Sequence, residues 1–458
     1  MAQKPSIPKG TRDFSPSEVN KRNYIFDVVK KHFQIYGFQP IETPSFENSE
    51  TLMGKYGDEG DRLIFKILNS GDFLNKVNDE LYSTKDSSAI TSKISEKALR
   101  YDLTVPFARY VVMHQNEIDF PFKRYQIQPV WRADRPQKGR FREFFQCDAD
   151  VVGSDSLLQE VELVQLYDAV FTDLKLDGVT IKLNNRKILA GIAEVIGERD
   201  KLIDFTVALD KLDKIGIEGV SKEMREKNIS VVAINKAAPL FALKGTNLEQ
   251  LSVLGNLLKD SEEGSKGVGE LRFIIETLEE LGLQSANLKI DVTLARGLNY
   301  YTGAIFEVAA PEGVSMGSIG GGGRYDDLTG IFGLKDVSGV GISFGLDRIY
   351  LVLEELGLFP EAIDQSLQVL CVNFGDKEAL TSLKLVNQLR RAGIKCDLYP
   401  SSAKMQKQMK YANNRNVPYV VLIGEQELAG NSFVVKDMVK GGQKTYSLDT
   451  PELFYKGL

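Results

Sequence analysis

Apolar residues near the start of the chain recur at the spacing of one helix face. Within segment 17–36 they are Val19, Ile25, Phe26, Val29 and Phe33. This spacing fits a helical period of about 3.6 residues. Gly37 then interrupts the pattern, and an extended stretch with Pro40 and Pro44 follows. We therefore predict a helix, a turn and a strand in this order.

Segments 123–131 and 140–152 each have the composition of a β-strand, and a charged loop joins them. Two strands connected in this way most simply form an antiparallel hairpin. Side chains alternate along a strand, so the second strand should have one polar and one apolar face. The polar face carries Arg142, Phe144, Gln146, Asp148 and Asp150.

Three further regions differ in their patterns. Residues 69–97 are polar and weakly periodic, which predicts an exposed excursion with some local order. Residues 198–283 are rich in helical periodicity and contain one proline, Pro239, so we predict an inserted helical unit. From Leu367 onward, strand-like and helical segments alternate. This alternation predicts βαβ units, a mostly parallel sheet and a separate C-terminal domain.

The length of 458 residues exceeds what one hydrophobic core usually serves and suggests about three units. With 43% hydrophobic and 26% charged residues, the composition is that of a globular protein. A pI near 5.4 and a net charge of -6 argue against a chain that coats nucleic acid non-specifically. Any contact with nucleic acid is therefore expected to be local.

Cysteine and histidine usage favours a reducing compartment and offers no zinc cluster. The three cysteines, Cys147, Cys371 and Cys396, lie far apart, and the only two histidines are His32 and His114. The first residues lack the apolar core of a signal peptide, and no run of about 18 apolar residues occurs. We expect a cytoplasmic protein with no membrane segment and no zinc.

The loop between the two predicted strands is strongly basic. From Arg132 to Arg142 it holds five cations against a single acid, Asp134. A guanidinium binds phosphate with two hydrogen bonds, the ring of Phe144 can stack on a base, and the carboxylate of Asp150 can accept an N–H. This combination favours a site for phosphate and base. The alternative interpretation is a solvated strand face whose charges serve solubility.

Arg348 falls in the first turn of a helix predicted after the strand in "GVGISFGLDRI". Free N–H groups and the helix dipole favour anions there, so this arginine indicates a phosphate site. The alternative is a pairing on its own helix with Asp347 or Glu354. The glycines at 320–323 match no phosphate-binding glycine motif and indicate only that the backbone bends or approaches something closely.

Arg296 lies beside Tyr300 and Tyr301 in "LARGLNYYTGAIFEV". A buried arginine is costly unless it is paired. We therefore expect it to contact an anion, either of a ligand or of the protein in an ordinary structural salt bridge.

The sequence contains no Ser–His or His–Asp pair at a spacing that indicates a catalytic arrangement. A carboxylate that attacks the α-phosphate of ATP is already ionised at neutral pH and needs only positioning and positive charge. An arginine-lined pocket fits that chemistry.

Several motifs resemble those of one family nearly from end to end. "YGFQPIETP", with Pro44, is similar to class II synthetase motif 1, "VWRADRPQKGRFREFFQCDAD" to motif 2 and "GVGISFGLDRI" to motif 3. These motifs are loose, whereas "RYDLT" at residues 100–104 and "LARGLNYYTG" at residues 294–303 are specific. The chain therefore resembles the histidyl-tRNA synthetases, especially their eukaryotic-like branch.

The resemblance implies an architecture of three parts. Residues 1–197 and 284–360 would form an α+β catalytic domain of the class II synthetase type, with a mixed, mostly antiparallel sheet. Residues 198–283 would be the inserted helical domain, and residues 366–458 an α/β anticodon-binding domain. Motif 1 further implies a homodimer. The implied reaction is ATP-dependent attachment of L-histidine to tRNA(His) through a histidyl-adenylate, with Mg²⁺ expected together with ATP.

The resemblance also implies roles for single residues. Arg132 would hold the α-phosphate of ATP, Phe144 would stack on adenine, Arg348 would bind the γ-phosphate end, and Arg296 would be the catalytic arginine near the α-phosphate and the amino-acid carboxylate. The histidine pocket would be formed by Asp102, Thr104 and Gln146 at the α-amino group, Asp150 and Tyr301 at the imidazole, and also Arg296, Tyr300 and Tyr325. Asn299 stands where the family usually has Asp, which places any ion pair at that position in doubt.

Contacts with tRNA are implied at two places. The acceptor end, including the extra 5′ guanosine of histidine tRNA, would meet the motif 2 loop through Arg135, Gln137, Lys138 and Arg140. The C-terminal helix in "SAKMQKQMKYANNR" would contribute Lys404 and Lys407, unless it is simply a solvated basic helix. Two alternative functions stay open: a catalytically inactive paralogue with a regulatory or tRNA-sensing role, and a class II enzyme for another amino acid. Retained arginines argue against the first and the two specific motifs against the second.

Overall fold

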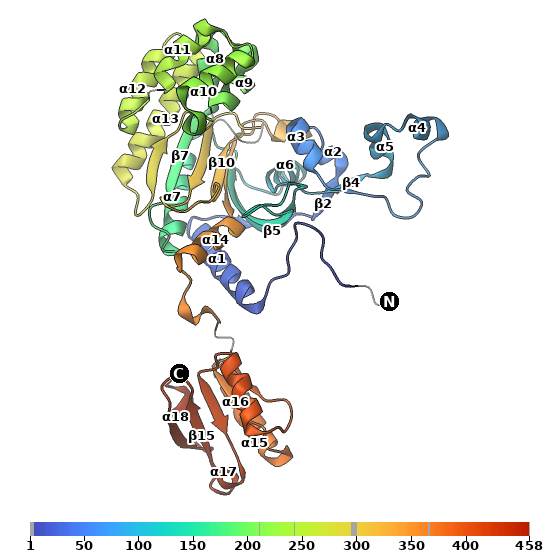
Figure 1. The fold of residues 1–458 in the computed structure, drawn as a ribbon, viewed down its shortest axis with the longest axis vertical. Coiled ribbons are helices and arrows are strands. Elements are labelled where there is room, and N and C mark those ends of the chain that lie inside the picture. Colours follow the sequence, from blue (N-terminus) through green and yellow to red (C-terminus); the bar gives the residue numbers. More distant parts are fainter. Residues whose placement is uncertain (1–3, 210, 242, 295–299, 365–366, 458) are drawn as a thin grey trace. The chain divides into compact units, whose positions relative to one another are not determined.

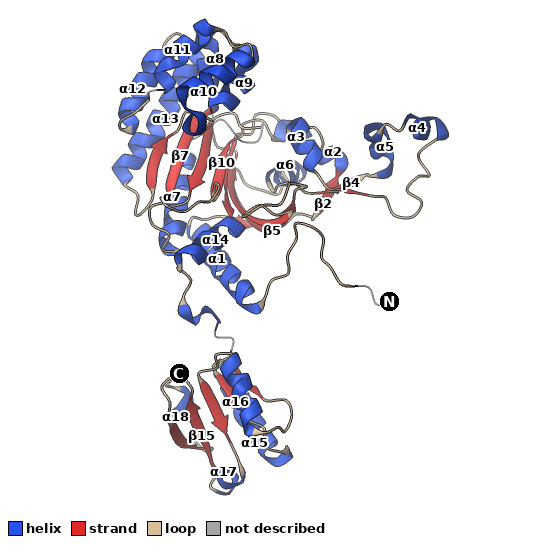
Figure 2. Cartoon of the chain, viewed as in Figure 1, coloured by secondary structure: helices blue, strands red, loops and turns tan. Residues whose placement is uncertain are grey.

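The computed structural model describes residues 4–209, 211–241, 243–294, 300–364 and 367–457. The chain divides into two compact units (Figure 1). The first consists of Met1–Asp13 and Arg22–Leu358, and the second of Phe14–Lys21 and Phe359–Leu458. Figure 2 shows that each unit combines helices with its own strands. None of the described helices is both long enough and apolar enough to cross a membrane.

An eight-stranded sheet forms the centre of the first unit. Its strands lie in the order β1-β5-β6-β11-β10-β9-β7-β8. The two outermost pairs, β1 with β5 and β7 with β8, are parallel, and the five pairs between them are antiparallel. The mixed, mostly antiparallel sheet is therefore confirmed. The strands are β1 Gln39–Pro40, β5 Phe122–Trp131, β6 Glu143–Val152, β7 Thr180–Asn185, β8 Asn287–Ile290, β9 Ala304–Ala309, β10 Gly320–Arg324 and β11 Gly339–Gly345.

Helices cover one face of this sheet with apolar side chains. They are α1 Pro16–Ile35, which confirms the predicted first helix, α7 Leu158–Asp173 and α14 Leu346–Leu356. The ring of Phe344 in β11 lies 5.8 Å from that of Phe33 in α1 and 5.6 Å from that of Phe171 in α7. All three rings are fully buried, so they anchor α1 and α7 to the same strand.

The segment between β1 and β5 forms a smaller antiparallel sheet. It consists of β2 Phe46–Asn48, β4 Lys97–Leu99 and β3 Lys66–Ile67. The helices of this region are α2 Ser49–Leu52, α3 Gly57–Leu63, α4 Asp79–Thr84, α5 Ser87–Ile94 and α6 Thr104–Met113. No residue of α4 or α5 is buried, so the local order predicted for the excursion 69–97 takes the form of two exposed helices.

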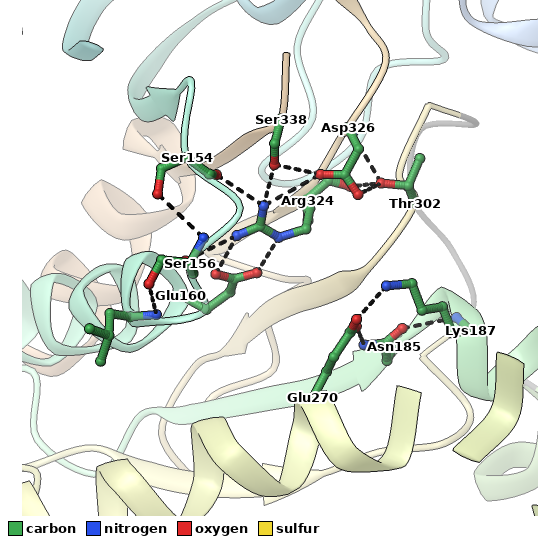
Figure 3. A network of polar contacts seen from close by, with 11 residues as sticks. Ser154, Ser156, Glu160, Asn185, Lys187, Glu270, Thr302, Arg324, Asp326 and Ser338 are labelled. Carbon is green, nitrogen blue, oxygen red and sulfur yellow. Dashed lines mark hydrogen bonds and ion pairs between the residues drawn. The ribbon is translucent and has the colours of Figure 1, made fainter. Parts of the chain in front are cut away.

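A layer of helices follows β7 (Figure 1). Its members are α8 Arg186–Ile196, α9 Leu202–Leu209, α10 Leu212–Glu226, α11 Val231–Phe241, α12 Asn247–Leu258 and α13 Glu262–Leu281. A Cβ on Gly191 of α8 would lie 2.4 Å from the Cα of Gly264 in α13, so only glycine permits this approach. Glu270 of α13 binds Asn185 and Lys187 at the start of α8 (Figure 3).

The C-terminal unit alternates strands and helices as predicted, but its sheet is only half parallel. β12 pairs in parallel with β13 and β14, whereas β15 pairs antiparallel with β14 and β16. The expectation of a mostly parallel sheet was wrong because the connections on both sides of β15 are shorter than the dozen or so residues that a parallel crossover requires. The elements are β12 Val369–Cys371, α15 Asp376–Arg391, β13 Cys396–Leu398, α16 Met405–Asn414, β14 Tyr419–Leu422, α17 Glu425–Ala429, β15 Ser432–Asp437, β16 Gln443–Ser447 and α18 Glu452–Tyr455.

Candidate active site

Two adjoining cavities open on the other face of the large sheet. The larger has a volume of about 360 Å³ and the smaller about 40 Å³. Ser343 and Gly345 line the larger cavity and flank the core residue Phe344 in β11, as strand alternation requires. The residues that line both cavities, and so mark their common boundary, are Gln146, Tyr301, Gly321, Gly322 and Ser343.

Among the residues that the structure describes, three arginines converge on the larger cavity: Arg132, Arg140 and Arg348. Arg132 directly follows β5, its Nε donates to the carbonyl of Tyr101 at 3.0 Å, and its guanidinium lies 5.2 Å from the ring centre of Phe144. Burial and the charges of Arg140 and Arg132 lower the pKa of Arg348. An anion placed among these guanidiniums would relieve their repulsion, so the cavity suits phosphate groups.

Arg348 lies in the first turn of α14, as the sequence predicted. Its Nε donates to the carbonyl of Gly139 at 3.0 Å, and its Nη1 donates to the carbonyl of Ser318 at 2.5 Å. These contacts hold the side chain across the cavity. Asp347, which the sequence offered as an alternative partner, instead pairs with Arg22 at 2.7 Å and with Arg12.

The segment around Arg12 crosses the motif 2 loop, a contact that the sequence did not predict. The guanidinium of Arg12 lies 3.4 Å from the ring centre of Phe141, and the carbonyl of Gly10 accepts from the backbone N–H of Arg142 at 2.8 Å. Arg142 was expected on the polar face of β6, but its Nε donates to the carbonyl of Asp134 and it does not line either cavity. It lies before the first residue of β6, where strand alternation no longer applies.

The smaller cavity is lined by carboxylates and tyrosines. It brings together the described residues that the resemblance assigned to histidine: Asp102, Thr104, Gln146, Asp150, Tyr300, Tyr301 and Tyr325. Asp148 also lines it. Strand alternation had placed Asp148 on the polar face of β6, yet neither the pattern nor the resemblance assigned it a role.

Asp102 is fixed by donors from three directions. Its Oδ1 accepts from the hydroxyl of Tyr56 at 2.9 Å and from the backbone N–H of Val105 at 3.1 Å, and its Oδ2 accepts from the hydroxyl of Tyr300 at 3.2 Å. Burial raises the pKa of Asp102, against the opposing charge of Arg132 and these hydrogen bonds. The carboxyl is therefore oriented before any ligand arrives.

Asp150 forms a buried ion pair with Arg124, its cross-strand neighbour in β5. The Oδ2 atom lies 2.8 Å from Nη2 of Arg124, and Oδ1 accepts from the hydroxyl of Tyr325 at 2.6 Å. A Cβ on Gly341 would lie 1.9 Å from Oδ1, so this glycine makes room for the carboxylate. Sequence reasoning missed Arg124 because strand register, which pairs it with Asp150, is not visible in the sequence.

A polar network around the buried ion pair of Arg324 with Glu160 connects two segments of the smaller cavity (Figure 3). Arg324 of β10 contacts Glu160 of α7 through two hydrogen bonds, one of them 2.7 Å long, and both side chains are buried. Arg324 also binds Asp326, whose other oxygen accepts from the hydroxyl of Thr302 at 2.8 Å. Thr302 and Asp326 directly follow Tyr301 and Tyr325, so this network fixes both tyrosines. Burial raises the pKa of both phenols, which keeps them as donors.

Two residues named from the sequence, Arg296 and Asn299, lie outside the described residues. The loop residues Arg135, Gln137 and Lys138 are exposed, and Lys138 pairs with Glu355 at 3.1 Å. Arg140 pairs with Asp134 at 3.1 Å while it lines the larger cavity. In the C-terminal unit, Lys404 and Lys407 are exposed at the start of α16.

A mostly antiparallel sheet that supports an arginine-lined cavity beside a carboxylate pocket, joined to a C-terminal α/β unit, defines a class II aminoacyl-tRNA synthetase. The sequence matches the family model for histidyl-tRNA synthetase over residues 86–349 and the model for the anticodon-binding domain over residues 367–452. The chain belongs to the histidyl-tRNA synthetase family.

Individual relatives agree with this assignment over nearly the whole chain. The chain is 72% identical to a histidine–tRNA ligase of Christiangramia forsetii and 66% identical to one of Flavobacterium johnsoniae, each over 97% of both chains. Its fold is similar to the crystal structure of histidyl-tRNA synthetase from Nostoc sp. PCC 7120, with a TM-score of 0.82, 31% identity and full coverage of both chains.

Proposed function

We propose that the protein attaches L-histidine to tRNA(His) in two ATP-dependent steps. The observation that carries this proposal is the shared boundary of the two cavities at Gln146, Tyr301 and Ser343. An amino acid held in the carboxylate pocket would direct its own carboxylate toward the arginine cavity, where ATP would present its α-phosphate. Proximity and orientation of this kind account for a large share of catalysis in such reactions.

Histidine would lie with its α-ammonium group at Asp102, Thr104 and Gln146. Its imidazole would meet Asp150 and Tyr301, beside Tyr300 and Tyr325. Neutral imidazole offers one donor and one acceptor, so a carboxylate and a phenol complement it. The family membership and the position of these residues around the smaller cavity support this arrangement. Such buried polar partners would be left unpaired by an apolar analogue, which would penalise it by on the order of 10⁴.

In the first step the carboxylate oxygen of histidine attacks the α-phosphorus of ATP, a new P–O bond forms, and pyrophosphate leaves. No general base is required because the carboxylate is already ionised. Arg132 and Arg296 would stabilise the charge on the α-phosphate, Phe144 would stack on adenine, and Arg348 would hold the γ-phosphate end. The convergence of Arg132 and Arg348 on one cavity supports these roles.

ATP is expected to arrive with Mg²⁺, and the residues present fit that mode of binding. Among the described residues, no group of three or more His, Cys, Asp or Glu forms a metal cluster. Mg²⁺ usually takes one or two carboxylates together with substrate phosphate oxygens, and Glu307 of β9 lines the larger cavity. Bound there, the ion would neutralise phosphate charge.

In the second step the terminal ribose hydroxyl of the tRNA attacks the histidyl-adenylate, and AMP leaves. Arg135, Gln137, Lys138 and Arg140 would contact the acceptor end, while Lys404 and Lys407 would contact the anticodon region. We accordingly assign catalysis to residues 1–197 and 284–360, and anticodon binding to residues 366–458, with residues 198–283 as an insertion. We further propose a cytoplasmic homodimer that uses the segment around Pro44 as its interface.

A charging assay with a matched pair of variants tests this function. Purified protein, ATP, labelled histidine and transcribed tRNA(His) should give labelled tRNA. Arg132→Ala should slow histidyl-adenylate formation by about 10² to 10³, the usual loss for one transition-state donor. Arg135→Ala should leave adenylate formation unchanged and slow only transfer to tRNA. Equal rates of adenylate formation in wild type and Arg132→Ala would contradict the role of Arg132.

A further inference from the structure

Near its start, the chain makes a tight turn that packs against the motif 2 loop. The backbone N–H and the hydroxyl of Thr11 both donate to the carbonyl of Pro8, at 3.2 and 2.8 Å. Gly10 has a φ of +87°, and a Cβ there would lie 2.8 Å from the Cγ atom of Arg142 and 2.9 Å from that of Pro136. Only glycine suits both this φ and this close approach, so the turn has a fixed shape and a fixed place on the loop.

Backbone hydrogen bonds continue from this turn to the first arginine of the loop. The carbonyl of Gly10 accepts from the N–H of Arg142 at 2.8 Å, and the carbonyl of Arg142 accepts from the N–H of Arg132 at 3.0 Å. The Nη1 atom of Arg142 also donates to the carbonyl of Lys9 at 3.4 Å. A segment that is remote in sequence therefore holds the base of the motif 2 loop.

Arg12 contacts two walls of the larger cavity from outside it. Its guanidinium carbon lies 3.4 Å from the ring centre of Phe141, and its Nη2 atom donates to Oδ1 of Asp347. Phe141 belongs to motif 2 and Asp347 to motif 3, and both line the larger cavity, whereas Arg12 does not. A guanidinium that stacks on a ring and pairs with a carboxylate is held at both points. Arg12 therefore connects the motif 2 wall to the motif 3 wall.

Asp347 has a second cation that does not depend on Arg12. Arg22 of α1 pairs with the same oxygen at 2.7 Å, and its side chain is 8% exposed, against 27% for that of Arg12. Removal of Arg12 leaves Asp347 paired with Arg22, so it does not create an uncompensated buried charge, which would be strongly destabilising. A variant of Arg12 is therefore expected to fold.

We propose that Arg12 is a positioning residue for the nucleotide: by joining Phe141 to Asp347, it fixes the separation of the two walls. Arg132 and Arg348 can then contact opposite ends of one triphosphate. This inference rests on the proposed function and adds to it a residue outside the cavity. ATP would span both walls, whereas AMP presents only the α-phosphate and would contact the motif 2 wall alone. Loss of Arg12 should therefore weaken the binding of ATP much more than that of AMP.

A comparison of two nucleotides tests this proposal on the full-length protein. Dissociation constants for ATP and for AMP are measured by calorimetry in the absence of histidine. The variants are Arg12→Ala, which removes both contacts, and Arg12→Gln, which removes the charge but keeps most of the side chain, in case the first is poorly folded. Arg390→Ala is the matched control, because Arg390 likewise pairs with a carboxylate, that of Asp397, and lies in the second unit, outside both cavities.

Misplacement of one wall should weaken ATP binding by about tenfold to hundredfold in the Arg12 variants, and AMP binding by less than about threefold. In pyrophosphate exchange, the KM for ATP should rise while the KM for histidine stays within about twofold of wild type. Arg390→Ala should keep the wild-type affinities for both nucleotides. Unchanged ATP binding in folded Arg12 variants, or equal losses for ATP and AMP, would overturn this inference alone. Failure of the wild type to bind ATP would overturn the proposed function with it.

Discussion

Single residues of the smaller cavity show how burial and strand register set the charge of a site. The two-residue period of β6 placed Gln146, Asp148 and Asp150 on one face, and this much follows from the sequence. The identity of their partners does not, because Arg124 becomes a neighbour of Asp150 only through the pairing of β5 with β6. The space that Gly341 leaves for Asp150 depends on the same register.

The raised pKa of Asp148 leads to a prediction about stability and pH. Its folded pKa of about 7 lies above the value of about 4 expected in the unfolded chain. The folded state therefore binds a proton that the unfolded state has lost, and stability falls as pH rises from about 4 through 7. Asp148→Asn removes this dependence. In the absence of ligands, the melting temperature of the variant minus that of wild type should be more positive at pH 8 than at pH 5.5.

Thermal melting at several pH values between 5.5 and 8 checks this prediction. Asp102 and Asp150 also have raised pKa values, so the wild type and the variant share a background decline in stability over this range. Only the difference between the two proteins reports on Asp148. Parallel melting curves across the whole range would contradict the assigned protonation of this carboxyl.

At the scale of elements, the sequence predicted the helices and strands that carry regular patterns. The helical period gave α1, and the hairpin of β5 and β6 followed from two strand-like segments joined by a charged loop. The glycine-rich strand β10 was harder to predict from the sequence. A Cβ on Gly322 would lie 2.2 Å from the carbonyl oxygen of Gly341, and one on Gly323 would lie 2.8 Å from the ring of Tyr301. The sequence indicated a close approach there, but not that the neighbours are β11 and the ring of Tyr301.

The ion pair between α7 and β10 gives a prediction that belongs to these elements. Breaking a buried ion pair by neutralising one partner typically costs about 3 to 5 kcal/mol, so Glu160→Gln should lower the melting temperature clearly. The pair fixes the segments that follow Tyr301 and Tyr325, so the KM for histidine should rise more than the KM for ATP. Glu276→Gln, in the more exposed pair with Arg272, should cost less than about 1 kcal/mol. Equal effects of both variants on stability would contradict the role given to Glu160.

The roles proposed above place adenylate chemistry and the contacts with the tRNA acceptor end in the first unit, and the contacts with the anticodon region in the second. Both cavities are lined by residues of the first unit, while Lys404 and Lys407 belong to the second. The sequence located the C-terminal unit by its alternating pattern, but not the antiparallel half of its sheet. Connection length decides that half, because the short helix α17 is the only regular element between β14 and β15 and the connection is too short for a parallel crossover.

A double variant tests this separation. If Lys404 and Lys407 contact phosphates of tRNA, replacing both with Ala should raise the KM for tRNA and reduce the slope of its logarithm against log salt by between about one and two. Pyrophosphate exchange without tRNA should be unchanged. Lys377→Ala with Lys384→Ala, in α15, removes the same charge from exposed positions, and it should keep the wild-type slope. An unchanged slope in the α16 variant would contradict the assignment of that helix to tRNA.

The central claim is that the two cavities on the large sheet bind one amino acid, histidine, together with ATP and form its adenylate. The most direct measurement is ATP–pyrophosphate exchange on the purified protein, with each of the twenty amino acids supplied separately and no tRNA present. The account predicts exchange with histidine and none above background with the others. Exchange with a different amino acid would contradict the assignment of the pocket formed by Asp102, Gln146 and Asp150. No exchange at all from a folded protein would contradict the enzymatic function itself.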